Sequence, residues 1–220
     1  MERTSACFLI VLCISAVQPV QAQQPPFYKE IQEFKKQDSL SYPPKNAILL
    51  VGSSSFTKWT DVQTYFPNHT IINRGFGGSS LPDVIRYAND IIIPYRPKQV
   101  IVYCGDNDLA SSDTVTAQMV VNRFKNLFQL IRKSLPSTNI TFVSIKPSPS
   151  RARLMPKMQK VNASVQSFLS KQKNVAFINV FRPMLLPDGK PKPELFVADS
   201  LHMNGKGYAI WQKAMEPYLK

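Results

Sequence analysis

Short apolar runs alternate with amphipathic segments along most of the chain. The runs are rich in β-branched residues and predict strands at Ala47–Val51, Thr70–Asn73, Gln99–Tyr103, Asn139–Ile145 and Val175–Asn179. Strands that alternate with helices are typical of a parallel sheet with both faces covered. We therefore expect an α/β protein built on a five-stranded parallel sheet.

The segments between these runs carry helical patterns. The clearest is Thr114–Leu135, where apolar residues repeat at helical spacing until Pro136 ends the pattern. Further helices are predicted at Phe27–Gln37, Phe56–Phe66, Leu81–Ile93, Pro156–Gln172 and Asn204–Leu219. No repeat is visible, so we expect one domain over residues 47–220, preceded by a polar extension over residues 23–46.

The first 22 residues have the pattern of a secretory signal. Arg3 supplies the positive start, an apolar core follows, and Val20-Gln21-Ala22 matches a small-residue cleavage site. We therefore expect export to the periplasm or the cell exterior. Cleavage after Ala22 would leave Cys104 as the single cysteine, so no internal disulfide is expected and Cys104 is predicted to be a buried thiol.

Composition and charge restrict the classes of partner. A hydrophobic content of 44% with 19% charged residues indicates a globular protein, not a disordered one. The net charge of +13 comes from scattered lysines and arginines without a dense basic block, so a nucleic-acid partner is not expected. The basic surface is either simply solvated or attracts anionic glycans or membrane surfaces. No apolar run approaches the roughly 20 residues that span a bilayer, so stable membrane insertion is not expected.

Candidate chemistry begins with a serine at a strand end. Ser54 lies in Gly52-Ser53-Ser54-Ser55, directly after the first strand, where open α/β sheets place their active sites. The chain has two histidines, and His69 lies in a turn at the opposite end of the sheet, where we expect a solvated residue. His202 follows Asp199 by three residues, so the carboxylate can accept from one imidazole nitrogen and leave the other as a base.

Two glycine-containing loops offer donors for an oxyanion. Asn107, in Gly105-Asp106-Asn107-Asp108 after the third strand, has a side-chain amide, and the loop Gly75–Gly78 after the second strand lets a backbone N–H approach a ligand. Each motif alone is typical of a turn, but together on neighbouring strand ends they indicate a site. Zinc-ligand spacing, a P-loop and a dinucleotide fingerprint are all missing from the sequence, so we expect neither a metal nor a cofactor.

These blocks, in this order, resemble the SGNH hydrolases, the GDSL-type esterase family, over about Ala47 to Leu219. The resemblance implies a flavodoxin-like three-layer α/β/α sandwich and ester hydrolysis through an acyl-enzyme. It implies that Ser54 is the nucleophile and that His202, oriented by Asp199, is the base. It also implies three oxyanion donors, namely the backbone N–H groups of Ser54 and Gly78 and the side-chain amide of Asn107.

The first block departs from the family pattern, which usually reads Gly-Asp-Ser. Ser53 replaces the aspartate, and three consecutive serines leave Ser53 and Ser55 as alternative nucleophiles; the distance from Gly52 favours Ser54. Ser53 and Arg151 are candidate substrate-binding residues. Arg151 and Arg153 follow the loop after the fourth strand and could meet an anionic or sugar substrate, although both could equally be solvated. Three aromatic residues either wall the site or belong to the core, namely Phe56, Trp59 and Phe76.

The substrate class remains open between several esters. Export, and the lack of a lipid-sized apolar insertion, favour a short-chain acyl or acetyl esterase that acts on carbohydrate. A lysophospholipase or platelet-activating-factor-acetylhydrolase-like lipid esterase is the alternative, and O-acyl transfer differs only in what attacks the acyl-enzyme. A non-catalytic glycan-binding protein on the same fold is a further alternative, supported only by the loss of the aspartate at Ser53.

Overall fold

The computed structural model describes residues 24–220, and the predicted signal segment, residues 1–22, lies outside them. The strands are β1 (Ile48–Gly52), β2 (Ile71–Gly75), β3 (Gln99–Tyr103), β4 (Asn139–Val143) and β5 (Val175–Ile178). The helices are α1 (Tyr28–Leu40), α2 (Ser54–Thr57), α3 (Val62–Tyr65), α4 (Leu81–Arg86), α5 (Ala88–Ile91), α6 (Asp106–Ala110), α7 (Ala117–Ser134), α8 (Met155–Leu169) and α9 (Gly205–Met215).

The strands form one parallel sheet in the order β2-β1-β3-β4-β5. Gly52 pairs with Gly75 on one side and with Tyr103 on the other, so three strands end level with one another. Since the carboxyl ends of parallel strands share one edge, the loops after β1, β2 and β3 start side by side. The predicted five-stranded parallel sheet is confirmed.

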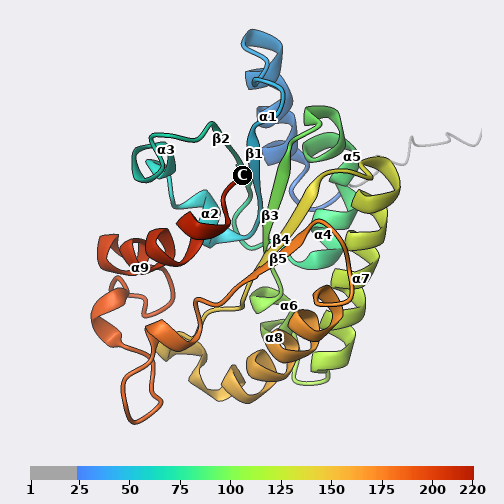
Figure 1. The fold of residues 1–220 in the computed structure, drawn as a ribbon. Coiled ribbons are helices and arrows are strands. Elements are labelled where there is room, and N and C mark those ends of the chain that lie inside the picture. The colour runs from blue at the N-terminus through green and yellow to red at the C-terminus, as the bar shows by residue number, and fades with distance from the viewer. Residues whose placement is uncertain (1–23) are drawn as a thin grey trace, which may run out of the picture.

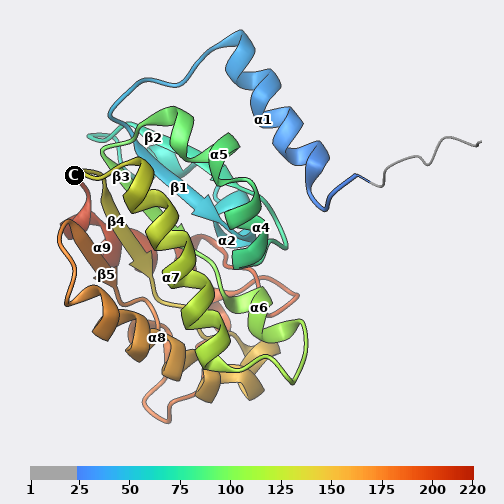
Figure 2. The same cartoon turned by 90° about the vertical axis from the view of Figure 1, so that its right-hand side faces the viewer.

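Helices cover both faces of the sheet and complete the predicted three layers (Figure 1). Successive strand residues point to opposite faces. Leu49 and Val51 of β1 join the apolar cluster under α4, α5, α7 and α8, whereas Ile48 and Leu50 join the cluster under α2, α3 and α9. Figure 2 shows α7 and α8 lying across the first of these faces. Burial on both faces explains why the strands are nearly continuous apolar runs.

Three aromatic residues were expected either to line the site or to belong to the core, and the structure places all three in the core. Phe56, Trp59 and Phe76 are buried. Trp59 stacks on Tyr208 at a centroid distance of 4.7 Å, and Phe56 meets Trp211 edge-on at 5.8 Å. These contacts attach α2 and the segment just after it to α9, and the two helices flank the site described below.

The N-terminal extension packs on the domain beside β2. Ile31 of α1 is buried, and Asp38 binds both the guanidinium of Arg74 and the hydroxyl of Tyr95. The Phe27 ring, just before α1, meets Phe76 edge-on at 5.3 Å. The extension is therefore part of the folded structure, while the boundary drawn at residue 47 stays a prediction.

Two of the predicted helices are divided in the structure. The helix predicted at Phe56–Phe66 is replaced by the two short helices α2 and α3. The helix predicted at Leu81–Ile93 is divided into α4 and α5 at Tyr87, whose hydroxyl bonds to the carbonyl of Pro26 at 2.7 Å. The Gly-Asp-Asn-Asp motif after β3, which taken alone is typical of a turn, forms the start of α6. Gly, Asp and Asn favour helix starts as much as turns, and here Asp108 accepts the N–H of Leu81 at 2.9 Å, which joins α6 to α4.

Candidate active site

The end of β1 presents Ser54 at the carboxyl edge of the sheet. Gly52 has a φ of +131°, and a Cβ at this position would lie 1.9 Å from the carbonyl oxygen of Tyr103, so only glycine fits. The chain turns there, the N–H of Ser53 donates to that carbonyl at 3.0 Å, and Ser54 becomes the first residue of α2. A first helical residue has no acceptor for its N–H within the helix, so this N–H is available to a ligand.

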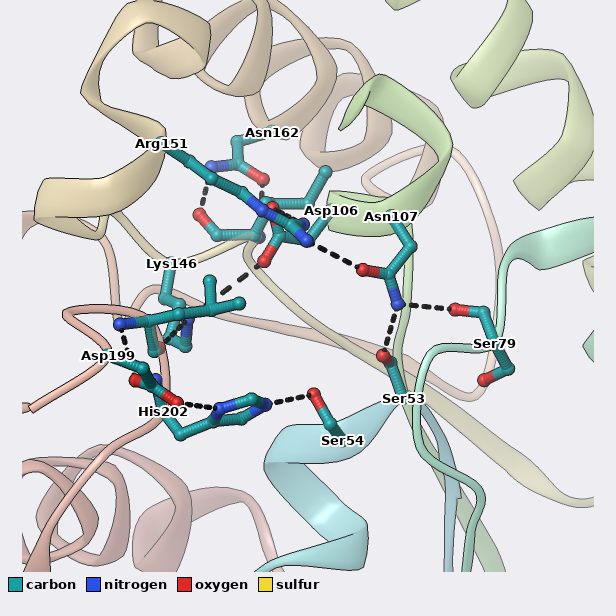
Figure 3. Close-up of polar contacts among 12 residues, drawn as sticks. Ser53, Ser54, Ser79, Asp106, Asn107, Lys146, Arg151, Asn162, Asp199 and His202 are labelled. Carbon is teal, nitrogen blue, oxygen red and sulfur yellow. Dashed lines mark hydrogen bonds and ion pairs between the residues drawn. The ribbon is translucent and has the colours of Figure 1, made fainter. Parts of the chain in front are cut away.

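Ser54, His202 and Asp199 form a continuous hydrogen-bonded chain (Figure 3). Ser54 Oγ lies 3.0 Å from His202 Nε2, and His202 Nδ1 lies 2.6 Å from Asp199 Oδ2. Because the carboxylate accepts a hydrogen bond from Nδ1–H, the neutral imidazole keeps its Nε2 lone pair for the serine hydroxyl. This arrangement can remove a proton from Ser54 and return it to a leaving group.

Asp199 is held by its own loop. Its Oδ1 accepts the backbone N–H groups of Leu201 and His202, both at 2.9 Å. The hydrogen bond from the His202 side chain and these two N–H groups hold the pKa of Asp199 well below its usual range. With 48% of its side chain exposed, the carboxylate also has little desolvation cost, and both factors keep it charged.

The loop that carries His202 is also held from beneath by a buried lysine. Lys146, just after β4, is 1% exposed, and its Nζ donates to the carbonyl of Leu201 at 2.9 Å. Burial lowers the pKa of Lys146, and the nearby carboxylate of Asp106, at 3.9 Å, opposes that shift. Lys146 was not among the predicted site residues, although it also follows a strand at this edge of the sheet.

Asn107 lies on the opposite side of Ser54, at the start of α6. Its Nδ2 donates to Ser53 Oγ at 2.7 Å and to the carbonyl of Ser79 at 3.0 Å. Its Oδ1 accepts from Arg151 Nη2 at 3.0 Å. Ser53 and Arg151, predicted as substrate contacts, are therefore both hydrogen-bonded to Asn107.

The loop after β2 passes beside the nucleophile. A Cβ on Gly77 would lie 3.9 Å from the Cβ of Ser54, and Gly78, with a φ of +85°, is exposed next to it. Among the described residues, the N–H groups of Ser54 and Gly78 make no hydrogen bond. These two N–H groups are therefore free to donate to an oxyanion, whereas both N–H bonds of Asn107 Nδ2 are used by Ser53 Oγ and the Ser79 carbonyl, so Asn107 would have to exchange its contact with Ser53 to act as the third donor.

The three consecutive serines have different environments. Ser54 Oγ bonds to a histidine, while Ser53 Oγ bonds to Asn107 and the carbonyl of Ser55 accepts the hydroxyl of Tyr208 at 2.9 Å. Ser53 and Ser55 are buried, and Ser54 is half-buried. Ser54 is the serine with a base beside it.

Other predicted residues lie outside the site. His69 is in the turn before β2, as predicted, but its side chain is 19% exposed, with Nε2 3.8 Å from Glu216 Oε1, and is not freely solvated. Arg153 is exposed and pairs with Asp113 at 2.6 Å. Cys104 is a buried free thiol, as predicted, and burial raises its pKa.

Within residues 24–220, no three His, Cys, Asp or Glu side chains gather in a way that would hold a metal ion. No helix in the same part of the chain has both the length and the apolar character needed to cross a membrane.

A parallel α/β sheet that presents a Ser–His–Asp chain beside amide donors defines a serine hydrolase. The sequence profile of the GDSL-like Lipase/Acylhydrolase family matches residues 38–210. The chain belongs to this family and is an ester hydrolase of the serine type.

Solved structures with the same fold come from several bacteria. A Streptococcus pneumonia protein provisionally described as a platelet activating factor is 24% identical, with a TM-score of 0.75 over 87% of this chain and 92% of its own. A GDSL-like lipase from Bacteroides thetaiotaomicron is 18% identical, with a TM-score of 0.73 over 85% and 95%. An acetylxylan esterase from Geobacillus stearothermophilus is 14% identical, with a TM-score of 0.61 over 80% and 94%. No curated protein matches the chain. At these identities the similarity establishes the fold and leaves the substrate open.

Proposed function

We propose that the protein is an exported esterase that removes short acyl groups, foremost acetyl, from carbohydrate through an acyl-enzyme. The observation that carries the proposal is the chain from Ser54 Oγ through His202 to Asp199, with separations of 3.0 Å and 2.6 Å. The polar surroundings of Ser54 and the burial of the neighbouring aromatic residues support a small acyl group.

In the proposed acylation step, Ser54 Oγ attacks the carbonyl carbon of the ester while His202 Nε2 takes the hydroxyl proton. The carbonyl oxygen becomes an oxyanion, which accepts hydrogen bonds from the Ser54 and Gly78 N–H groups and from Asn107 Nδ2. When the intermediate collapses, the bond from carbon to the alcohol oxygen breaks and that oxygen takes the proton from Nε2. Asp199 stabilises the imidazolium that exists between these two transfers.

In the proposed deacylation step, water attacks the acyl carbon and gives a proton to His202 Nε2. Collapse then breaks the bond to Ser54 Oγ, which regains the proton, and the carboxylic acid leaves. If a sugar hydroxyl attacks in place of water, the same steps transfer the acyl group, so the identity of the attacking group separates hydrolysis from transfer.

A lipid ester is the second candidate substrate. The observation in its favour is the likeness to the Streptococcus pneumonia protein provisionally described as a platelet activating factor. The likeness to an acetylxylan esterase favours carbohydrate to a similar degree, since both neighbours are below 25% identity. Our choice of carbohydrate rests on the expected export and on the absence of a lipid-sized insertion in the sequence.

Labelling with a fluorophosphonate probe tests whether the protein is catalytic. We expect wild-type protein to be labelled and Ser54→Ala to remain unlabelled. Ser53→Ala and Ser55→Ala are matched controls from the same loop and should still react. An unlabelled wild type would support the non-catalytic glycan-binding alternative.

Substrate panels then test the acyl group and the alcohol. With p-nitrophenyl esters of increasing chain length, we expect the highest kcat/KM for acetate, and with acetylated sugars we expect release of acetate. A preference for long chains would contradict the carbohydrate proposal and favour the lipid ester. Export is tested separately, since the mature exported chain should begin at Gln23.

A further inference from the structure

Asn107 can serve an oxyanion only if its side-chain nitrogen, and not its oxygen, faces the nucleophile. The two ends of a carboxamide are similar in size but opposite in hydrogen-bonding character. A reversed amide would point its oxygen at the developing negative charge and oppose the reaction. The neighbours of Asn107 must therefore select one orientation.

Two of these neighbours distinguish the ends of the amide, and one does not. The carbonyl of Ser79 can only accept, so it requires Nδ2 at its distance of 3.0 Å. The guanidinium of Arg151 can only donate, so it requires Oδ1 at its distance of 3.0 Å. Ser53 Oγ, at 2.7 Å from Nδ2, can donate or accept and would satisfy either end.

We infer that Arg151 is a positioning residue that fixes the Asn107 carboxamide with Nδ2, and not Oδ1, on the side of Ser53 and the nucleophile. The N–H that bonds to Ser53 Oγ in this structure is then the one that an acyl oxygen can take over. This inference rests on the proposed esterase function and assigns Arg151 a role through Asn107. It replaces direct contact with substrate, which the sequence suggested for Arg151.

Arg151 is itself held on two sides. Its Nη1 pairs with Asp106 Oδ1 at 2.7 Å, and Asp106 directly precedes Asn107 in α6. The side chains of Arg151 and Asp106 are only 19% and 8% exposed. Next to Arg151, the N–H of Ser150 donates to the carbonyl of Ser200 at 3.1 Å, which ties this segment to the loop of Asp199 and His202.

The same contacts speak against a role for Arg151 as an anion-binding residue. Its charge is already balanced by Asp106, and one of its terminal nitrogens is used by Asn107. A substrate anion would have to displace a poorly exposed carboxylate, which would then lose its nearest guanidinium. The planar guanidinium of an arginine can bind a carboxylate and an amide at the same time, which a lysine does less well.

A double-mutant cycle with Asn107 tests the inference, with p-nitrophenyl acetate as an uncharged substrate. We expect Arg151→Met to lower kcat by about tenfold or more, the scale of a lost hydrogen bond from a charged donor, with little change in KM. In the Asn107→Ala background the same substitution should cost less than about threefold, because the residue through which it acts is gone. Arg151→Lys should recover only part of the loss.

Arg153→Met is the matched control, since Arg153 lies two residues away and is exposed. It should leave kcat and KM unchanged. Arg151→Met leaves the buried Asp106 carboxylate without its guanidinium and could therefore destabilise the fold. If the single variant folds poorly, the same kinetic comparison is made with the double variant Asp106→Asn and Arg151→Met, which has no unpaired carboxylate. Equal losses from Arg151→Met in both backgrounds, or a change confined to KM, would overturn the inference.

A second measurement does not depend on catalysis. The side-chain amide resonances of Asn107, identified by their loss in Asn107→Ala, should move in Arg151→Met and stay in place in Arg153→Met. Unmoved resonances in Arg151→Met would overturn the inference even if the enzyme is active. Conversely, if wild type shows no turnover but the Asn107 amide resonances move in Arg151→Met, the proposed function is contradicted. The contact between Arg151 and Asn107 would still be supported.

Discussion

Two groups of residues meet at Ser54 and are built differently. On one side, Asp199 and His202 belong to a single loop, and Asp199 is 48% exposed. On the other side, Asn107 is held by Ser53, Ser79 and Arg151, which come from other segments of the chain. The ion pair behind Asn107 is mostly shielded from water, with Asp106 only 8% exposed.

The difference shows two ways of fixing a polar group. An exposed carboxylate has little desolvation cost, so three local hydrogen bonds suffice to keep Asp199 charged and oriented. A buried carboxylate such as Asp106 needs a partner of opposite charge, which Arg151 provides. The first arrangement needs only a short stretch of sequence, and the second needs the fold.

The largest loss of activity should follow substitution of the nucleophile or of its base. We expect Ser54→Ala and His202→Ala each to lower kcat by about a million-fold, because either change removes the nucleophile–base unit. The measurement is steady-state hydrolysis of p-nitrophenyl acetate. His69→Ala is the matched control and should retain full activity, since His69 lies at the other end of the sheet. Full activity in Ser54→Ala would exclude Ser54 as the nucleophile.

Asp199→Asn should have the next largest effect, a loss of about ten-thousand-fold in kcat, because an amide at this position favours the wrong imidazole tautomer. The depressed pKa of Asp199 also links it to stability. Its contribution is complete above the unfolded-state pKa of about 3.9 and is lost as the pH falls through the lower folded-state value. Thermal unfolding should therefore show a lower Tm for Asp199→Asn than for wild type at neutral pH, and the difference between the two Tm values should narrow in strong acid. A constant difference would mean that the carboxylate charge does not stabilise the loop.

Asn107→Ala tests the opposite side of Ser54. We expect a loss of about 100–1,000-fold in kcat with KM nearly unchanged, the scale of one side-chain oxyanion donor. Steady-state kinetics with p-nitrophenyl acetate separate the two constants. If KM rises and kcat does not fall, Asn107 binds the ground state and the two sides of the site have been assigned incorrectly.

Ser53→Ala should have the smallest effect in this series. The hydroxyl accepts one hydrogen bond from Asn107 Nδ2, at 2.7 Å, while Ser79 and Arg151 retain their hydrogen bonds with the same amide. Loss of one neutral hydrogen bond of about 0.5–1.5 kcal/mol corresponds to about a twofold to tenfold decrease in kcat. A decrease as large as that of Asn107→Ala would show that the serine at position 53 is essential in this variant of the first block.

A contact within the site could be predicted when its two residues lie close together in the sequence, and not when they lie far apart. Asp199 and His202 are three residues apart, so one short motif predicts their contact. Asn107 and Arg151 are 44 residues apart, and nothing in either local sequence indicates that they touch. Lys146 was missed for the same reason, since its acceptor, the carbonyl of Leu201, is 55 residues away.

The fold shows the same division. β3 was predicted to its last residue at Gln99–Tyr103, because a run that is buried on both faces is continuously apolar. The helix α6 was not predicted, since glycine, aspartate and asparagine are typical both of turns and of helix starts. The joining of α6 to α4 through Asp108 and Leu81 depends on residues 27 positions apart.

The parallel sheet, the loops at its carboxyl edge and the Asp199–His202 pair could be predicted from local sequence, because periodicity and short spacing are local properties of a chain. Which of the three serines meets a base, and which way the Asn107 amide faces, became known from the folded structure. Those outcomes depend on donors and acceptors from the segments after β1, β2, β3 and β4 and from the loop of His202, which the fold brings within about 3 Å of one another, the distance at which hydrogen bonds form.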